Sequence, residues 1–230
     1  MGTWNTIREI IEFIDMVVTI VGFLSHLWES PATVGDMVAP VTYPSSNVRV
    51  VDDEIPGRPR PEDLVRVSAP LSSDLTAELD GAIAFAGLGV EEVLLAALGR
   101  AIARAVGVGV VTVSGLTTVQ PIRLCCAEER DMDANALLAD VREALTPARQ
   151  LSNSPADLVF SFLGLPPDPS LGPLQLTDGP ALGVLAYRAG GELQMDWWFD
   201  GRRLDCSTVE ELTSQFRLGL IGLTSEAVPA

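Results

Sequence analysis

The sequence predicts an α/β protein in which a mixed β-sheet is flanked by helices. Short runs of β-branched residues alternate along the chain with longer apolar segments of helical spacing. Near the C-terminus, Ala189-Gly190-Gly191 joins two strand-like segments, which is typical of a β-hairpin. Hydrophobic residues make up 47% of the chain and charged residues 20%, which is the composition of a globular protein.

Residues 1–29 are predicted to form an amphipathic helix. Apolar residues recur at helical spacing from Ile7 to Leu24, so one side of this helix should be buried. Arg8, Glu12 and Asp15 interrupt the apolar segment, and no small-residue cleavage site follows a basic leader. We therefore expect neither a signal peptide nor a membrane span, and we predict a cytoplasmic protein.

The rest of the chain is predicted to form an irregular connector at 30–62 and a folded lobe at 63–226. Pro, Gly, Ser and Asp dominate the connector, with one strand candidate at Val48–Val51. Strands of the lobe are predicted at Leu64–Ala69, Val108–Val113, Thr118–Cys125, Leu158–Leu163, Ala181–Arg188 and Glu192–Phe199. Helices are predicted at Asp74–Ala86 after a Ser72 or Ser73 cap, Val90–Val106, Ala134–Leu145, and from a Ser207 or Thr208 cap to Thr224.

Charge and composition exclude several classes of function. The formal net charge of −16 disfavours nucleic acids and anionic membranes as partners. All fifteen basic residues are arginine, so no lysine can form a Schiff base. The three cysteines lack a CxxC spacing, and the acidic run from Glu128 to Asp133 is typical of a solvated loop. We therefore expect no metal site, and we expect no cofactor.

Four segments in order carry a resemblance to a known family. They are a pair of helices, a strand ending in Pro-x-Arg, an Arg-x-x-Ser-x-x-Pro loop with the strand after it, and a closing strand, turn and helix: Leu71–Arg104, Thr117–Leu124, Arg149–Gly164 and Gly191–Leu220. From about Val65 to Glu226 the sequence resembles the C-terminal lobe of nonribosomal peptide synthetase condensation domains. These domains are relatives of chloramphenicol acetyltransferase in the CoA-dependent acyltransferase superfamily, so the resemblance implies a chloramphenicol acetyltransferase-like single lobe.

The sequence departs from this family at two places. Family members carry a His-His-x-x-x-Asp-Gly motif in their N-terminal lobe, whereas the one histidine here is His26, with no Asp-Gly beside it. The resemblance aligns Thr3–Trp28 with the helix that follows the motif, so we expect a truncated, condensation-like chain. Relatives also insert a long excursion over the active-site channel between positions corresponding to Val113 and Val119, where this chain has only a short turn.

Two residues are candidates for proton transfer or nucleophilic chemistry. His26 is a candidate catalytic base, although a histidine near a helix C-terminus also suits the helix dipole. Cys206 precedes the last predicted helix, where a helix N-terminus would lower the pKa of an exposed thiol. Helix capping by its neighbours explains the same region without any reaction.

Four residues are candidates for substrate binding. Arg123 matches the arginine of the family strand, where it either orients a phosphate or carboxylate or forms a structural ion pair. Asp157 either faces the channel or caps the turn at Pro155. Ser161 shares a strand face with Val159 and Leu163, where its hydroxyl lines a tunnel or bonds to the backbone.

Trp198 is the fourth candidate, and its neighbour Trp197 decides its orientation. Adjacent residues of a strand point to opposite faces of the sheet. If Leu193, Met195 and Trp197 face the core, Trp198 lies outside and marks an interface or a ligand site.

These observations leave two hypotheses for the function. In the first, the chain is a truncated condensation-like protein of nonribosomal peptide or polyketide biosynthesis, unable to condense alone, that works as a homo-oligomer or with a separate N-lobe or synthase partner. In the second, it is a repurposed enzyme that uses a cleft of the lobe for cyclisation or acyl transfer. Its ligand would then be a carrier-protein-bound or free small-molecule intermediate.

Overall fold

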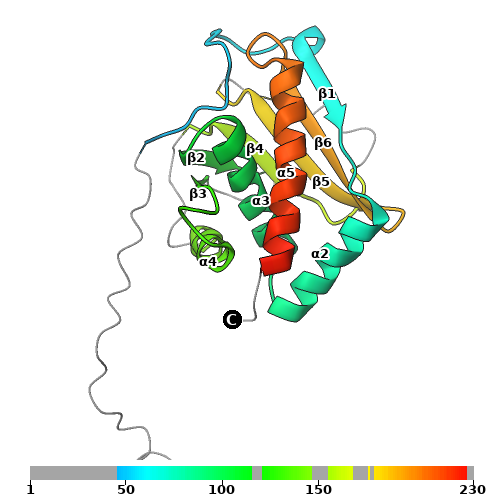
Figure 1. Ribbon diagram of the computed structural model, residues 1–230. Coiled ribbons are helices and arrows are strands. Elements are labelled where there is room, and N and C mark those ends of the chain that lie inside the picture. Colours follow the sequence, from blue (N-terminus) through cyan, green and yellow to red (C-terminus); the bar gives the residue numbers. More distant parts are fainter. Residues whose placement is uncertain (1–45, 116–120, 147–154, 168–175, 177–178, 227–230) are drawn as a thin grey trace, which may run out of the picture. The chain divides into compact units, whose positions relative to one another are not determined.

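The computed structural model describes residues 46–115, 121–146, 155–167, 176 and 179–226 (Figure 1). All of them belong to one unit, Thr42–Ala230. The predicted N-terminal helix with His26, and the first part of the connector, lie outside the described residues.

The sheet contains six described strands in the order β1-β6-β5-β4-β2-β3 (Figure 1). Their bounds are β1 (Leu64–Ser68), β2 (Gly109–Ser114), β3 (Ile122–Cys126), β4 (Leu158–Phe162), β5 (Leu182–Ala189) and β6 (Glu192–Asp200). β4 runs parallel to β2 and β5, while the other three pairings are antiparallel. The sheet is therefore mixed, which confirms the predicted α/β class. Gly190 and Gly191 both adopt positive φ in the β5–β6 turn, as the predicted hairpin requires.

The helices begin and end at local signals that the sequence carries. Besides the short 3-10 helix η1 (Pro61–Asp63), the described helices are α2 (Ser73–Ala86), α3 (Val90–Ala105), α4 (Ala134–Ala144) and α5 (Cys206–Glu226). Ser72 caps α2 by accepting a hydrogen bond from the Leu75 N–H at 3.2 Å, and Asp133 caps α4 in the same way. Gly87 ends α2 in the left-handed region, which allows the chain to turn sharply into α3.

Two predicted elements differ in the structure. α5 begins at Cys206, so neither Ser207 nor Thr208 caps it; the Asp205 carbonyl accepts the first helical hydrogen bond, from the Val209 N–H. The candidate strand at Val48–Val51 is only a single parallel bridge between Asn47 and Val110. Further along the chain, the backbone N–H groups of Asp52 and Asp53 donate to the Arg203 carbonyl.

The connection between β2 and β3 is short, as the sequence indicates. The two strands are antiparallel neighbours with Val113 opposite Ile122. β3 starts at Ile122 rather than at Thr118, and residues 116–120 lie outside the described part of the chain.

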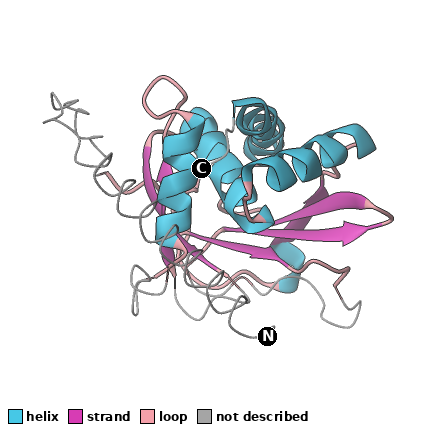
Figure 2. Ribbon diagram, turned by 90° about the horizontal axis from the view of Figure 1, so that it is seen from below, coloured by secondary structure: helices cyan, strands magenta, loops and turns pink. Residues whose placement is uncertain are grey.

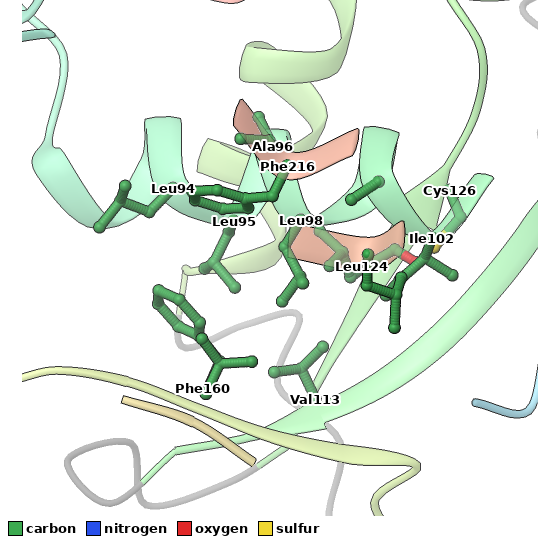
Figure 3. Packing of buried hydrophobic residues seen from close by; sticks show 14 of the residues in the cluster. Leu94, Leu95, Ala96, Leu98, Ile102, Val113, Leu124, Cys126, Phe160 and Phe216 are labelled. Carbon is green, nitrogen blue, oxygen red and sulfur yellow. The ribbon is translucent and has the colours of Figure 1, made fainter. Parts of the chain in front are cut away.

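The core lies between one face of the sheet and the α-helices, all four of which lie on that side (Figure 2). Every residue of α3 from Val93 to Ala103 is buried, because this helix is packed between the sheet and α5 (Figures 1 and 3). Trp197 of β6 meets Phe216 of α5 edge to face, with ring centroids 5.8 Å apart. These contacts join the sheet to α5 as well as to α3.

Arg100 of α3 is a buried cation at the edge of this core. Its side chain is 1% exposed, and its Nη1 donates to the Ala127 carbonyl at 2.6 Å while Nη2 donates to the Met132 carbonyl. The Glu129 carboxylate lies 3.8 Å from Nε. Desolvation by burial lowers the pKa of Arg100, although an arginine keeps its charge under such a shift. The guanidinium thereby ties α3 to the loop between β3 and α4.

Two glycines allow α3 to approach its neighbours closely. A Cβ atom at Gly99 would lie 2.5 Å from the Cys125 carbonyl oxygen of β3. A Cβ atom at Gly219 of α5 would lie 3.0 Å from Arg100 Cβ and 3.3 Å from the Ala97 carbonyl. Larger residues at either position would push α3 away from the sheet or from α5.

Within the described residues, no single helix is long and apolar enough to cross a membrane. The pair α2 and α3 reaches that length only when both are counted together, across a bend of 116°.

We predict that Gly99→Ala destabilises the fold by about 1–3 kcal/mol, because the new methyl group meets a backbone oxygen that has no room to move. Gly81→Ala in α2 is the matched control. Nothing lies within 4 Å of a Cβ there, so the variant should gain up to about 1 kcal/mol from helix propensity. Urea unfolding curves measure both changes, and equal stability of the two variants would contradict the close approach.

Candidate functional site

The face of the sheet opposite the helices carries predicted site residues, among them Ser161 and Trp198, and we call it the helix-free face. Strand register defines it: Trp198 lies beside Gly183 and Val159, and Asp196 lies beside Leu185 and Ser161. On the outer side of β6, Arg66 of β1 is paired with Trp198. Its members are Arg66, Val159, Ser161, Leu185, Tyr187, Asp196 and Trp198.

The centre of the helix-free face is an ion pair. Arg66 Nη2 donates hydrogen bonds to both carboxylate oxygens of Asp196, at 2.8 and 2.7 Å. The Asp196 side chain is only 4% exposed, whereas that of Arg66 is 45% exposed. The Tyr187 hydroxyl donates to Asp196 Oδ2 at 3.3 Å. Burial raises the pKa of Tyr187, and the Asp196 charge raises it further.

Trp198 stands beside this ion pair. The Arg66 guanidinium carbon lies 5.5 Å from the centroid of its ring, within the range of a cation–π contact. Trp197 is fully buried on the opposite face together with Leu193 and Met195. The predicted orientation of the two tryptophans is therefore confirmed, and Trp198 is half-buried on the helix-free face.

A small apolar cluster extends the helix-free face toward β4. Leu176 is 1% exposed and Leu185 is 7% exposed, and Val159, Leu163 and Tyr187 pack against them. Ser161 is fully buried here and shares its face with Val159 and Leu163, as the alternation along the strand predicts.

Arg123 and Asp157 lie nearer the β3 edge of the sheet, one on each side of Thr112 of β2. Arg123 is exposed on β3, directly opposite Thr112 in the register. The Asp157 carboxylate accepts from the Thr112 N–H at 2.8 Å, and the Asp157 N–H donates to the Thr112 carbonyl at 2.8 Å. Asp157 thus holds the start of β4 against β2.

Arg66, Tyr187 and Asp196 are absent from the residues predicted to form a site. Asp196 carries a local signal, since it is a carboxylate within the apolar run of β6. Its partner Arg66 lies 130 residues earlier, so no short-range pattern joins the two.

A narrow slot lies at the end of β2, lined by Leu95, Val113, Ser114 and Phe160, with Glu91 at its rim. Burial raises the pKa of Glu91. The repurposed-enzyme hypothesis calls for a closed apolar pocket that could hold an acyl intermediate. The volume of this slot is about 10 Å³, which is no more than a single water molecule requires.

The thiols have little nucleophilic character. Cys125 and Cys126 are buried, and desolvation raises the pKa of Cys125 to about 11 and that of Cys126 even more. Cys206 is exposed, but its pKa is raised rather than lowered, first by desolvation and then by Glu210. Glu210 Oε1 lies 3.6 Å from its Sγ, so the expectation from the helix N-terminus is wrong.

The acidic run after β3 is engaged in structural contacts. Glu129 pairs with Arg104, Asp133 caps α4, and Glu128 lies 3.2 Å from Arg130. In the described ranges, no three His, Cys, Asp or Glu side chains converge as a metal site would require.

We predict that Asp196→Asn lowers the pKa of Tyr187 toward its ordinary value of about 10, because the variant removes the neighbouring negative charge. Ultraviolet titration of tyrosinate measures this in a Tyr43→Phe background, where Tyr187 is the remaining one of two tyrosines. Asp80→Asn removes the same charge from the Arg188 ion pair and should leave the titration unchanged. An unmoved Tyr187 in Asp196→Asn would contradict the contact.

Thiol labelling of the native protein should modify Cys206 alone, since Cys125 and Cys126 are buried and stay protonated near neutral pH. All three thiols should react after unfolding. Glu210→Gln should accelerate labelling of Cys206 by lowering its pKa. Mass spectrometry after timed exposure to iodoacetamide identifies the labelled residues, and native labelling of Cys125 or Cys126 would contradict the packing of β3.

Comparison with known proteins gives one group of sequence relatives, which are subunits of a phenolphthiocerol/phthiocerol polyketide synthase. The one from Mycobacterium tuberculosis is 30% identical to the chain over an alignment of 224 residues. The match covers 75% of the chain, and the chain spans 15% of the length of that synthase protein. Its counterpart of the same name from Mycobacterium bovis is similar to the same extent. No protein-family model matches the sequence.

Solved structures show a closer agreement in fold than in sequence. The epimerization domain from the third module of tyrocidine synthetase B superposes with a TM-score of 0.56 at 15% identity, covering 93% of this chain and 56% of that one. The EpoB cyclization-docking bidomain from Sorangium cellulosum gives 0.57 at 14% identity, covering 82% and 46%. The first condensation domain of the CDA synthetase gives 0.54 at 15% identity, covering 78% and 48%.

These three structures share with the chain the fold that its four local segments indicate. At such identities the agreement concerns the fold alone. The chain has the α/β fold of a condensation-like domain.

Proposed function

We propose that the chain forms one lobe of a condensation-type domain in a polyketide or nonribosomal peptide assembly line, where it binds a partner lobe rather than catalysing condensation. The observation that carries this proposal is the 30% identity to a polyketide synthase protein, found in a chain with a condensation-like fold. It supports a role for the lobe in natural-product biosynthesis.

A binding role follows from the chemistry that the residues offer. Amide or ester formation from a thioester needs a group that moves a proton and donors for the developing oxyanion. The sequence has one histidine, His26, and no lysine. The described thiols have raised pKa values, which keep them protonated near neutral pH. A histidine base other than His26 would therefore come from a partner.

The helix-free face has the composition of a binding surface. Trp198, Tyr187 and Arg66 belong to the residue types that are enriched at the centres of protein interfaces. Half-buried Val159 and Leu163 lie beside them. A second lobe, supplied by another copy of this chain or by another protein, would cover these side chains and exclude water from the Arg66–Asp196 pair.

We predict that Trp198→Gln weakens association of the lobe by about 30-fold, which corresponds to loss of a central aromatic contact worth about 2 kcal/mol. Sedimentation equilibrium measures self-association of the chain. The same measurement after adding a separate condensation-type N-terminal lobe tests association with another protein. Leu218→Gln is the matched control, since Leu218 is 54% exposed on α5 and should not contribute.

Circular dichroism confirms that both variants fold. A wild-type chain that stays monomeric in both measurements would refute the proposal. Equal association of wild type and Trp198→Gln would show that the helix-free face is not the interface.

A further inference from the structure

A pocket of about 350 Å³ lies where the N-terminus of α2, the start of β6 and the middle of α5 meet, and it does not depend on the proposed function. Volumes of about 300–1,000 Å³ are typical of small-molecule sites, so this pocket admits a ligand of amino-acid size. Its lining combines an apolar floor with two charged groups: Pro70, Leu71, Ser72, Leu75, Glu192 and Arg217.

Backbone contacts hold the apolar floor of the pocket in place. The Leu71 N–H donates to the Leu193 carbonyl of β6 at 2.9 Å, which fixes the segment between β1 and α2. Ser72 caps α2 through the Leu75 N–H, which fixes the backbone at Leu75. Leu71 is 2% exposed and Leu75 is half-buried. The aliphatic surface of the pocket is therefore formed before any ligand enters.

The two charged groups of the pocket come from different elements and are not paired with each other. Glu192 stands at the start of β6, opposite Ala189 of the β5–β6 hairpin, and Arg217 belongs to α5. Arg217 Nη2 donates to the Pro70 carbonyl at 3.2 Å. Among the described residues, neither charged side chain lies within ion-pair distance of an opposite charge. The lining thus offers one carboxylate and one guanidinium, whose charges sum to zero.

These two groups determine which charges a ligand can carry. A ligand with a single charge would match one of them and be repelled by the other. A ligand with one positive and one negative group can match both, and its aliphatic body would cover Leu71 and Leu75.

We propose that this pocket binds a small zwitterion with an aliphatic body, with its ammonium group on Glu192 and its carboxylate on Arg217. A guanidinium donates parallel hydrogen bonds to a carboxylate, and Arg217 keeps N–H groups for this purpose beside its bond to Pro70. Two kinds of ligand share this chemistry. In an aliphatic α-amino acid the two charges are adjacent, and in an ω-amino acid they lie at opposite ends.

The test titrates the protein with leucine, with its single-charge analogues isopentylamine and isocaproate, and with ε-aminocaproate, and it follows amide shifts by NMR at constant ionic strength. At least one zwitterion should bind about threefold more tightly than either analogue, because each analogue lacks one exposed charge contact. Tighter binding of leucine identifies adjacent charges, and tighter binding of ε-aminocaproate identifies separated ones. An analogue that binds as tightly as both zwitterions would overturn the charge assignment. Absence of saturable shifts at Leu71, Leu75 and Glu192 would overturn the site.

Substitution of the two charged residues should change the preference between the analogues in opposite directions. Glu192→Gln should weaken binding of isopentylamine about threefold and strengthen binding of isocaproate, because the carboxylate attracts the first and repels the second. Arg217→Gln should do the reverse. Arg217 is exposed and Glu192 is half-buried, so the fold should tolerate both variants. A loss of folding would weaken both analogues and could not reverse their order.

Glu54→Gln and Arg130→Gln are the matched controls for net charge. The Glu54 side chain is 70% exposed and that of Arg130 is 73% exposed, and neither residue lines the pocket. Neither control should change the preference between isopentylamine and isocaproate. An equal change in Glu54→Gln and Glu192→Gln would mean that the ligands sense only the overall charge of the chain, and it would overturn the pocket.

Discussion

The structure depends on how closely α3 lies between the sheet and α5. Gly99 brings this helix within contact of the Cys125 carbonyl on one side, and Gly219 brings α5 onto Ala97 and Arg100 on the other. Because neither glycine carries a side chain, α3 can lie directly against β3 and against α5. Trp197 of the sheet then contacts Phe216 of α5 across the core. Arg100 then fixes the loop after β3 through two backbone carbonyls. The positions of β3, α4 and α5 all follow from this one helix.

Because every described α-helix lies on one side, the two faces of the sheet have different properties (Figure 2). The helix side is apolar and fully buried, as Leu193, Met195 and Trp197 illustrate. The other side combines an ion pair, an aromatic ring and a small apolar cluster. Such a mixed surface is stable in contact with water and still offers groups that a partner can desolvate.

The sequence predicts the elements whose ends carry local signals. The β5–β6 turn depends on Gly190-Gly191, and α2 and α4 are capped by Ser72 and Asp133. All of these contacts lie within a few residues along the chain. It does not predict contacts between distant segments, such as Arg66 with Asp196, nor that Asp157 bonds to Thr112 of another strand. The pKa of the Cys206 thiol also departs from the expectation, since desolvation and Glu210 raise it.

Because all of its basic residues are arginine, the stability of this fold at alkaline pH depends on its buried thiols. No lysine loses its charge as the pH rises, so the carbonyl contacts of Arg100 persist. The thiols behave differently, because the folded-state pKa of Cys125 is about 11 and the unfolded value is about 8.5. At a pH below the Cys125 pKa of the unfolded chain, the thiol contributes its full share to the free energy of unfolding. As the pH rises toward the pKa of the folded state, the thiol ionises in the unfolded chain first, and the free energy of unfolding falls. The buried cysteines, rather than the ion pairs, therefore limit the stability of this protein at alkaline pH.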